Sequence, residues 1–113
     1  MKSEKKAMWV VFKMKALPSK EEMRERFQTL YHIYRDHPAI EYKAWYMNEE
    51  KLEWGAFYVF RSQELLAEYL KADLWTKEIP GRWGVTPEYT VLDLCAVVSK
   101  SLITDGQDSW MAD

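Results

Sequence analysis

The stretch IEYKAWYMNEEKLEWGAFYVF, from Ile40 to Phe60, decides the fold. Its first part, Ile40 to Met47, alternates apolar and mixed positions, and this period of two is typical of a β-strand with one buried face. Residues 48–51 are polar and form a turn. The aromatic run from Trp54 to Phe60 then predicts a second strand that closes a hairpin with the first, and Gly55 inside it indicates a bulge or a close packing contact.

Helices are expected on both sides of this hairpin and strands at both ends of the chain. Ser19 with Glu22 three residues later forms a capping box, and Ser62 is the N-cap of a second helix. The predicted elements are a strand from residue 8 to 15, a helix from 19 to 36, the hairpin, a helix from 62 to about 73 and a strand from 89 to 98.

This βαββαβ order predicts the α+β class and the ferredoxin-like fold, in which two helices cover one face of a four-stranded antiparallel sheet. The strands are apolar on both alternating faces, so we expect the bare face to be buried against a second copy in a homodimer. The single domain is predicted over residues 8–98. Residues 1–7 are expected to form a flexible N-terminal tail and residues 99–113 a C-terminal tail.

Composition excludes several classes of function. The 113 residues carry a net charge of −2, which argues against a nucleic-acid binder or a protein of anionic membrane surfaces. A single cysteine, Cys95, and two histidines cannot complete a tetrahedral zinc site, and no phosphate-binding loop occurs, so we expect no metal and no cofactor. Cys95 is expected to be an inert, packed thiol. No apolar stretch approaches the ~18 residues of a membrane span, so we expect a cytoplasmic protein.

Residues 73–84 are too long and too apolar for an ordinary connection. They contain Trp75, Ile79 and Trp83, and we assign no helical or strand period to them. We interpret the segment as a loop that closes over a cavity as a lid.

Four segments of the chain resemble the YdhR-like putative monooxygenases of the dimeric α+β barrel superfamily. They are PAIEYKAW (Pro38–Trp45), GAFYVF (Gly55–Phe60), Tyr69–Leu70 and Val91–Asp93, within a likeness that spans residues 8–102. The resemblance implies a dimeric barrel of two back-to-back sheets, with an apolar cavity between the sheet and the helices of each subunit.

The resemblance also implies a small cofactor-free enzyme of natural product biosynthesis that acts on an apolar, aromatic or polyketide-like molecule as a monooxygenase. The substrate must then supply the electrons, because no residue set here binds a redox cofactor. A fold hosts many reactions, so two alternatives stay open. One is a non-oxidative cyclase, isomerase or lyase on the same scaffold, and the other is a non-catalytic protein that binds a small molecule.

Two residues are candidates for moving a proton. Asp73 projects toward Leu66 and Tyr69 if the second helix reaches it, and partial burial would make a carboxylate a usable base near neutrality. The alternative is that Asp73 only begins the following segment and caps its first turn. Tyr46 is the second catalytic candidate.

Seven aromatic residues are candidates for substrate binding, because wide amphipathic rings can line an apolar pocket and phenols can orient a polyphenolic ligand. Core packing with satisfied hydroxyls is the alternative for each of them. The candidates are Tyr31, Tyr34, Tyr42, Tyr58, Tyr69, Trp75 and Trp83.

Four further polar residues receive structural interpretations. Lys43 and Asp93 are predicted to form an ion pair across the dimer interface, and the alternative is that Lys43 is a catalytic lysine. His32 is expected to face solvent. His37, just before Pro38, is expected to stabilise the end of the first helix as a cation, and the alternative is a role at the mouth of the cavity.

Overall fold

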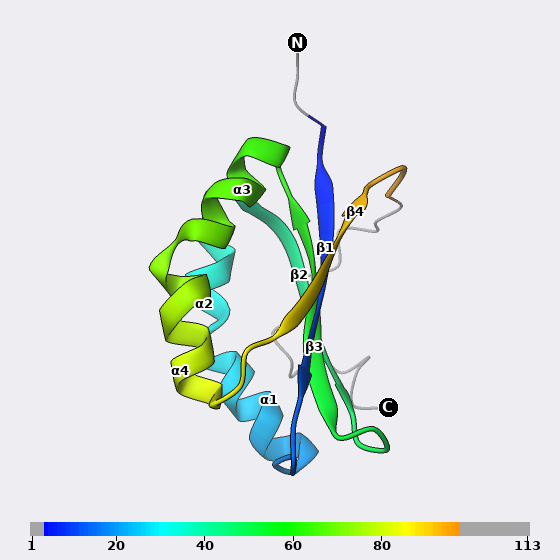
Figure 1. Ribbon diagram of the computed structural model, residues 1–113, viewed down its shortest axis with the longest axis vertical. Helices are drawn as coiled ribbons and strands as arrows, with labels where there is room; N and C mark the ends of the chain where they lie inside the picture. Colours follow the sequence, from blue (N-terminus) through cyan, green and yellow to red (C-terminus); the bar gives the residue numbers. More distant parts are fainter. Residues whose placement is uncertain (1–3, 98–113) are drawn as a thin grey trace.

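A four-stranded antiparallel sheet of order β2-β3-β1-β4 forms one layer, and all the helices lie on one of its faces (Figure 1). The computed structural model describes residues 4–97. The strands are β1 (Lys6–Lys13), β2 (Ile40–Asn48), β3 (Glu53–Phe60) and β4 (Glu88–Asp93). The helices are α1 (Lys20–Gln28), α2 (Tyr31–Arg35), α3 (Gln63–Lys71), the π-helical turn η1 (Leu74–Glu78) and α4 (Ile79–Trp83). This arrangement confirms the predicted α+β, ferredoxin-like fold.

Both predicted helix caps are present, but the first helix is divided in two. The hydroxyl of Ser19 accepts a hydrogen bond from the Glu22 N–H, and that of Ser62 accepts one from the Leu65 N–H, each at 3.1 Å. At the end of α1 the Thr29 hydroxyl donates to the Arg26 carbonyl at 2.7 Å. Such side-chain bonds compete with the helical ladder, and the chain restarts as α2.

Gly55 marks a close packing contact. This was one of the two alternatives predicted from the sequence, the other being a bulge. A Cβ at this position would lie 1.9 Å from the Val10 carbonyl oxygen and 2.7 Å from the Tyr46 hydroxyl. Only glycine permits this approach of neighbouring strands. The bulge of the hairpin lies elsewhere, in β2 between Ile40 and Tyr42.

The segment predicted as a loop over 73–84 is helical, and that prediction was wrong. Trp75 and Ile79 are each 7% exposed and belong to the core between sheet and helices. Together with Trp83 they recur every four residues, which is the period of one helix face. Pro80 lies in the first turn of α4, where its missing N–H costs nothing, and Gly84 ends the helix with φ of 75°.

The two terminal strands differ from their predicted bounds. β1 begins at Lys6, so the last two residues assigned to the N-terminal tail belong to the sheet. β4 ends at Asp93 instead of continuing to Val98, and Cys95 beyond it is exposed rather than packed. Val98 and the predicted C-terminal tail lie outside the described residues. Within residues 4–97, no helix has the length and apolar character needed to cross a membrane.

The sheet face opposite the helices carries large apolar side chains in the open. Trp9 is 50% exposed and Tyr42 is 56% exposed, and Leu92 of β4 is also exposed. The pairings Trp9 with Phe57 and Leu92 with Ala7 place these residues on the face that no helix covers. Within residues 4–97, no second layer covers this apolar face of the sheet.

Candidate active site

Lys43 lies on the helix-facing side of the sheet. It pairs in register with Tyr58, whose side chain is buried beneath the helices. The predicted ion pair with Asp93 across a dimer interface is therefore wrong, because Asp93 pairs with Lys6 of the same chain. The alternation of β2 was predicted correctly, but which face it turns to the helices depends on its pairing with β3.

The Lys43 ammonium is enclosed by aromatic rings. Its Nζ lies 3.2 Å from the ring centroid of Tyr34, 4.4 Å from that of Tyr58 and 4.5 Å from that of Trp45. In the described part of the chain no carboxylate forms an ion pair with it. Burial holds the pKa of Lys43 well below its usual value. A lysine of this kind can act as a base, and its protonated form is stabilised by the ring faces.

Three buried phenols surround this amine. The hydroxyls of Tyr58 and Tyr69 lie 3.3 Å apart, and the ring edge of Tyr34 packs on Tyr58 with centroids 6.3 Å apart. Burial raises the pKa of all three tyrosines above the usual value. They therefore remain protonated near neutrality and can donate hydrogen bonds to an anionic oxygen.

His37 borders the phenols instead of serving as a cationic helix cap. Its Nδ1 accepts a hydrogen bond from the Ala39 N–H at 3.1 Å, and its ring meets that of Tyr69 edge to face, with centroids 5.5 Å apart. Burial, with a smaller effect of the Lys43 charge, lowers the pKa of His37. The prediction of a cation at this helix end was wrong. His32 is exposed, as expected.

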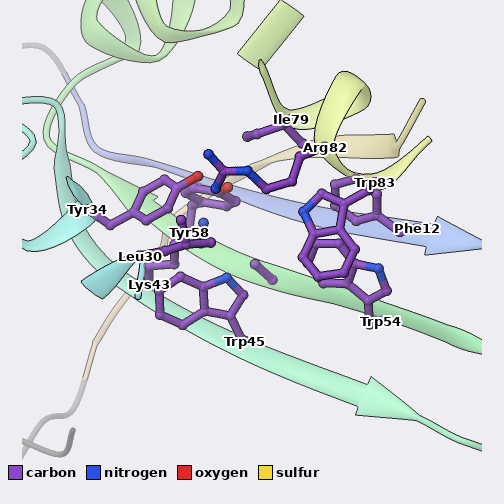
Figure 2. A pocket seen from close by; sticks show the side chains of 11 residues that line it. Phe12, Leu30, Tyr34, Lys43, Trp45, Trp54, Tyr58, Ile79, Arg82 and Trp83 are labelled. Atoms are coloured by element: carbon purple, nitrogen blue, oxygen red, sulfur yellow. The ribbon is translucent and has the colours of Figure 1, made fainter. Parts of the chain in front are cut away.

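A narrow cavity opens above Lys43, between the sheet and α4 (Figure 2). Its volume is about 20 Å³, which is enough for about one water molecule. Its wall and floor come from β1, β2, β3 and α2, and its cover from α4. The lining residues are Phe12, Leu30, Tyr34, Lys43, Trp45, Trp54, Ala56, Tyr58, Ile79, Arg82 and Trp83.

A wider groove lies outside this cavity and has a volume of about 390 Å³. It is lined by Arg26, Thr29, Leu30, Ile33, Arg82 and Trp83. Leu30, Arg82 and Trp83 line both spaces, so these side chains separate the inner cavity from the outer groove. An aromatic ligand can reach Lys43 only if the α4 side chains move aside.

The aromatic wall of the cavity includes a polar atom without a partner. The Trp54 ring stacks on Phe12 with centroids 3.9 Å apart and lies 4.2 Å from the Trp83 ring. Its indole N–H is buried and has no hydrogen-bond partner within residues 4–97. Buried donors are almost always paired in native proteins, so this one calls for an acceptor. In the same range, no three His, Cys, Asp or Glu side chains are grouped to hold a metal ion.

The structure brings most of the predicted binding residues together. Tyr34, Tyr58 and Trp83 line the cavity. Tyr31 and Trp75 lie just outside the lining. Tyr31 packs on Trp45, and Trp75 packs on Tyr69, with centroids 5.7 Å apart in each pair.

Tyr42 and Tyr46 lie on the opposite face of the sheet, away from the cavity. The Tyr46 hydroxyl accepts a hydrogen bond from the Trp9 indole at 3.0 Å and donates one to the Val10 carbonyl at 3.2 Å. Its phenol covers Gly55. These contacts fit a structural role between β2 and β1, and the proposed site does not include Tyr46.

Asp73 does not have the environment that a catalytic base was expected to have. Its side chain is 73% exposed and pairs with Lys77, with Oδ1 and Nζ 3.6 Å apart. It precedes η1 without forming a side-chain cap. Asp73 is thus neither desolvated nor a cap, and it lies outside the cavity lining.

Sequence reasoning missed Arg82 as a site residue and kept a catalytic Lys43 only as the alternative to an interface ion pair. Lys43 was noticed, but it was interpreted as an interface residue because the bare and covered faces of β2 could not be told apart. The signal available was its two-residue spacing from Trp45, which belongs on the same face. Arg82 lay in the segment interpreted as a loop, where its direction could not be predicted.

The family model described as "Putative mono-oxygenase ydhR" matches residues 8–87, more than half of the chain. The chain belongs to this family. No curated protein has a significant sequence match to it.

Solved structures share the fold at low sequence identity. A protein of unknown function, NE2512 from Nitrosomonas europaea, is 12% identical with a TM-score of 0.63, covering 86% of this chain and 95% of its own. A mutant of SnoaB, a cofactor-independent oxygenase from Streptomyces nogalater, is 10% identical with a TM-score of 0.58. The match covers 88% of this chain and 100% of the SnoaB chain. The ActVA-Orf6 monooxygenase of Streptomyces coelicolor, in complex with nanaomycin D, is 12% identical with a TM-score of 0.61, covering 88% and 94%. These neighbours agree with the predicted ferredoxin-like α+β fold.

Proposed function

We propose that this protein is a cofactor-independent monooxygenase acting on a hydroxylated aromatic or polyketide-like molecule, with Lys43 as the base that removes a substrate proton. The observation that carries the proposal is the Lys43 amine, which packs against three aromatic rings at the floor of a Trp-lined cavity. Two findings add support. The family is named for mono-oxygenases, and two structural neighbours are described as oxygenases, one of them with a bound nanaomycin D.

The proposed chemistry begins with a proton transfer. The neutral Lys43 amine takes a proton from an activated CH₂ group of the substrate, such as that of an anthrone, and leaves a resonance-stabilised carbanion. The ammonium pairs with this anion while Tyr34, Tyr58 and Trp45 stabilise the positive charge. The phenols of Tyr34 and Tyr58 are placed to donate to the oxyanion form of the substrate.

The substrate then supplies the electrons. The carbanion reduces O₂, a C–O bond forms, and Lys43 returns its proton to give a hydroperoxide. Loss of the second C–H proton with cleavage of the O–O bond gives a carbonyl and one water, so that CH₂ and O₂ become C=O and H₂O. The aromatic walls exclude bulk water during these steps.

Substrate entry requires movement of the cover. The cavity is too small for a ring system, and Arg82 and Trp83 close it toward the outer groove. The adjacent π-helical turn η1 is a kind of element that recurs at functional sites. A lid role for residues 73–83 thus stays part of the proposal, with a helical cover in place of a loop.

The bare sheet face supports a homodimer as part of this proposal. Trp9, Tyr42 and Leu92 expose apolar surface on one continuous layer, and a second copy of that layer would bury it. Sedimentation at micromolar concentration is expected to give twice the chain mass, and a monodisperse monomer would contradict it. A cytoplasmic location and a place in natural product biosynthesis stay predictions.

The test compares Lys43→Met with wild type in an oxygen electrode, using a panel of anthrones and hydroquinones. We expect a loss of about 10²-fold or more in the rate of O₂ uptake, which is the usual contribution of a general base. Lys51→Met makes the same change in the exposed turn between β2 and β3 and is expected to keep full activity.

Three outcomes separate the candidate functions. Conversion of a substrate without O₂ would replace the monooxygenase with a cyclase, isomerase or lyase that uses the same base. Saturable quenching of tryptophan fluorescence without any product would indicate a binding protein. Equal O₂ uptake by wild type and Lys43→Met would remove Lys43 from the mechanism.

A further inference from the structure

Arg82 is the charged side chain that lines both the inner cavity and the outer groove. Figure 2 shows it extending from α4 toward Tyr34, over the cavity that Lys43 closes from below. Within residues 4–97 it forms no ion pair. The pKa of Tyr34 is raised mainly by burial and is lowered in part by the Arg82 charge, so this charge acts on the cavity.

The other charges near the groove are balanced or lie apart from Arg82. The Arg26 guanidinium lies 5.3 Å from the centre of the Trp83 ring, but it pairs with Glu22 at 3.2 Å. Glu78 also affects Tyr34 without pairing with Arg82. Within residues 4–97, the Arg82 guanidinium is thus left without an ion-pair partner at the passage between the two spaces.

We propose that the substrate is an aromatic carboxylate whose ring lies over Lys43 and whose carboxylate binds Arg82 where the cavity meets the groove. This inference rests on the proposed function, because it names the substrate class of the same site. Once the α4 side chains have moved aside for a ring over Lys43, a substituent on that ring leaves the inner cavity past Arg82, since Leu30, Arg82 and Trp83 line both spaces. A planar guanidinium binds a carboxylate through two parallel hydrogen bonds.

The charge balance favours a carboxylate over a phosphate. A single unpaired arginine offers one positive charge, which matches the single negative charge of a carboxylate. A phosphate monoester carries about −1.5 to −2 near neutrality and would need a second unpaired cation. Arg26 does not supply it because it already pairs with Glu22, and Lys43 does not supply it because the proposed mechanism uses the neutral amine.

Isothermal titration with two probes of the same shape tests the proposal. 1-Naphthylacetate carries a carboxylate, and 1-naphthylacetamide replaces it with a neutral amide. We expect wild type to bind the acetate about tenfold more tightly, and the preference to weaken at high salt. 1-Naphthyl phosphate serves as the third ligand, and tighter binding of the phosphate than of the acetate would overturn the carboxylate assignment.

Matched variants identify the cation responsible. Arg82→Gln is expected to abolish the preference for the acetate, whereas Lys77→Gln, an exposed change in the neighbouring turn, is expected to preserve it. Lys43→Met should change the affinity for both probes and keep their ratio. Near-ultraviolet circular dichroism checks that each variant is folded.

The inference is overturned if wild type binds both probes equally or binds neither, or if Lys43→Met rather than Arg82→Gln removes the preference. The readout is separate from turnover. A preference for the acetate in a protein that never consumes O₂ would refute the proposed oxygenase but keep the carboxylate site. Consumption of O₂ only with uncharged aromatics would refute the carboxylate site but keep the proposed oxygenase.

Discussion

The two faces of β2 differ in what their polar groups do. On the face toward the helices, the Lys43 ammonium packs against three aromatic rings, and no carboxylate of the described chain forms an ion pair with it. On the bare face, the Tyr46 hydroxyl has both a donor and an acceptor. Unpaired polar groups that are buried cost stability, so they persist where a function needs them. In the proposed mechanism, the difference places the chemistry on one face of the strand, whereas the hydrogen bonds on the other face hold the sheet together.

The largest effect expected concerns the pH dependence of activity through Lys43. Burial lowers the pKa of this amine, and the proposed base is active only when neutral. The rate should therefore rise as the pH rises through the lowered pKa. In Lys43→Met this rising limb of the pH–rate profile should disappear. The rate itself should fall by about 10²-fold or more. His37 also titrates below its usual pKa, so His37→Gln serves as the control that keeps the limb.

The same residue gives a stability prediction of defined sign. Because the pKa of Lys43 is lower in the folded protein, the unfolded chain binds more protons between the two pKa values, and stability rises with pH in that window. The burial penalty is fully present below the folded pKa and is relieved as the pH approaches the ordinary lysine value. Urea unfolding of wild type and Lys43→Met should thus converge as the pH rises. A difference in the free energy of unfolding between the two proteins that stays constant with pH would mean that Lys43 is not desolvated.

Gly55→Ala is expected to have the largest effect on stability. Its Cβ would lie 1.9 Å from the Val10 carbonyl oxygen, which is backbone and cannot rotate away. The strands would have to separate, at a cost of about 3 kcal/mol or more in the free energy of unfolding. Gly81→Ala is the matched control, since a Cβ there meets nothing within 4 Å and is expected to be neutral. Equal urea midpoints for the two variants would contradict the close approach.

Local signals made the fold predictable from the sequence. The Ser19 and Ser62 caps depend on residues three positions apart, and the strand alternation depends on neighbours two positions apart. The break of the first helix at Thr29 was not predicted, because it is a competition between two hydrogen bonds that a helical period does not reveal.

The site was less predictable because it depends on contacts between distant segments. The face of β2 that receives the helices is set by its register with β3, and Lys43 was assigned to the wrong face for that reason. Residues 73–84 were interpreted as a loop because no helical period was assigned to them, although a proline such as Pro80 is favoured in the first turn of a helix. This hid the four-residue period of Trp75, Ile79 and Trp83 and, with it, the position of Arg82.

Tyr46→Phe tests the bare face of the comparison. The change removes two hydrogen bonds, to Trp9 and to Val10, and keeps the ring over Gly55. We expect a loss of about 1 kcal/mol in the free energy of unfolding, with O₂ uptake close to that of wild type. Tyr42→Phe on the same face is expected to change neither the free energy of unfolding nor the rate of O₂ uptake. A large loss of activity in a stable Tyr46→Phe protein would restore Tyr46 as a catalytic residue.

The smallest effect is expected for Asp73→Asn, and it separates the sequence-based hypothesis from the structure. A catalytic Asp73 would lose about 10²-fold or more in kcat, because asparagine has nearly the same shape but cannot accept the proton. In the structure the carboxylate is exposed and only pairs with Lys77 at 3.6 Å, an arrangement that contributes little to stability. We therefore expect kcat and the melting temperature to stay near the wild-type values when chemistry limits the rate. A large fall in kcat would show that the cover moves during turnover and carries Asp73 into the cavity, and hydrogen exchange of residues 73–83 with and without an aromatic ligand would then reveal that movement.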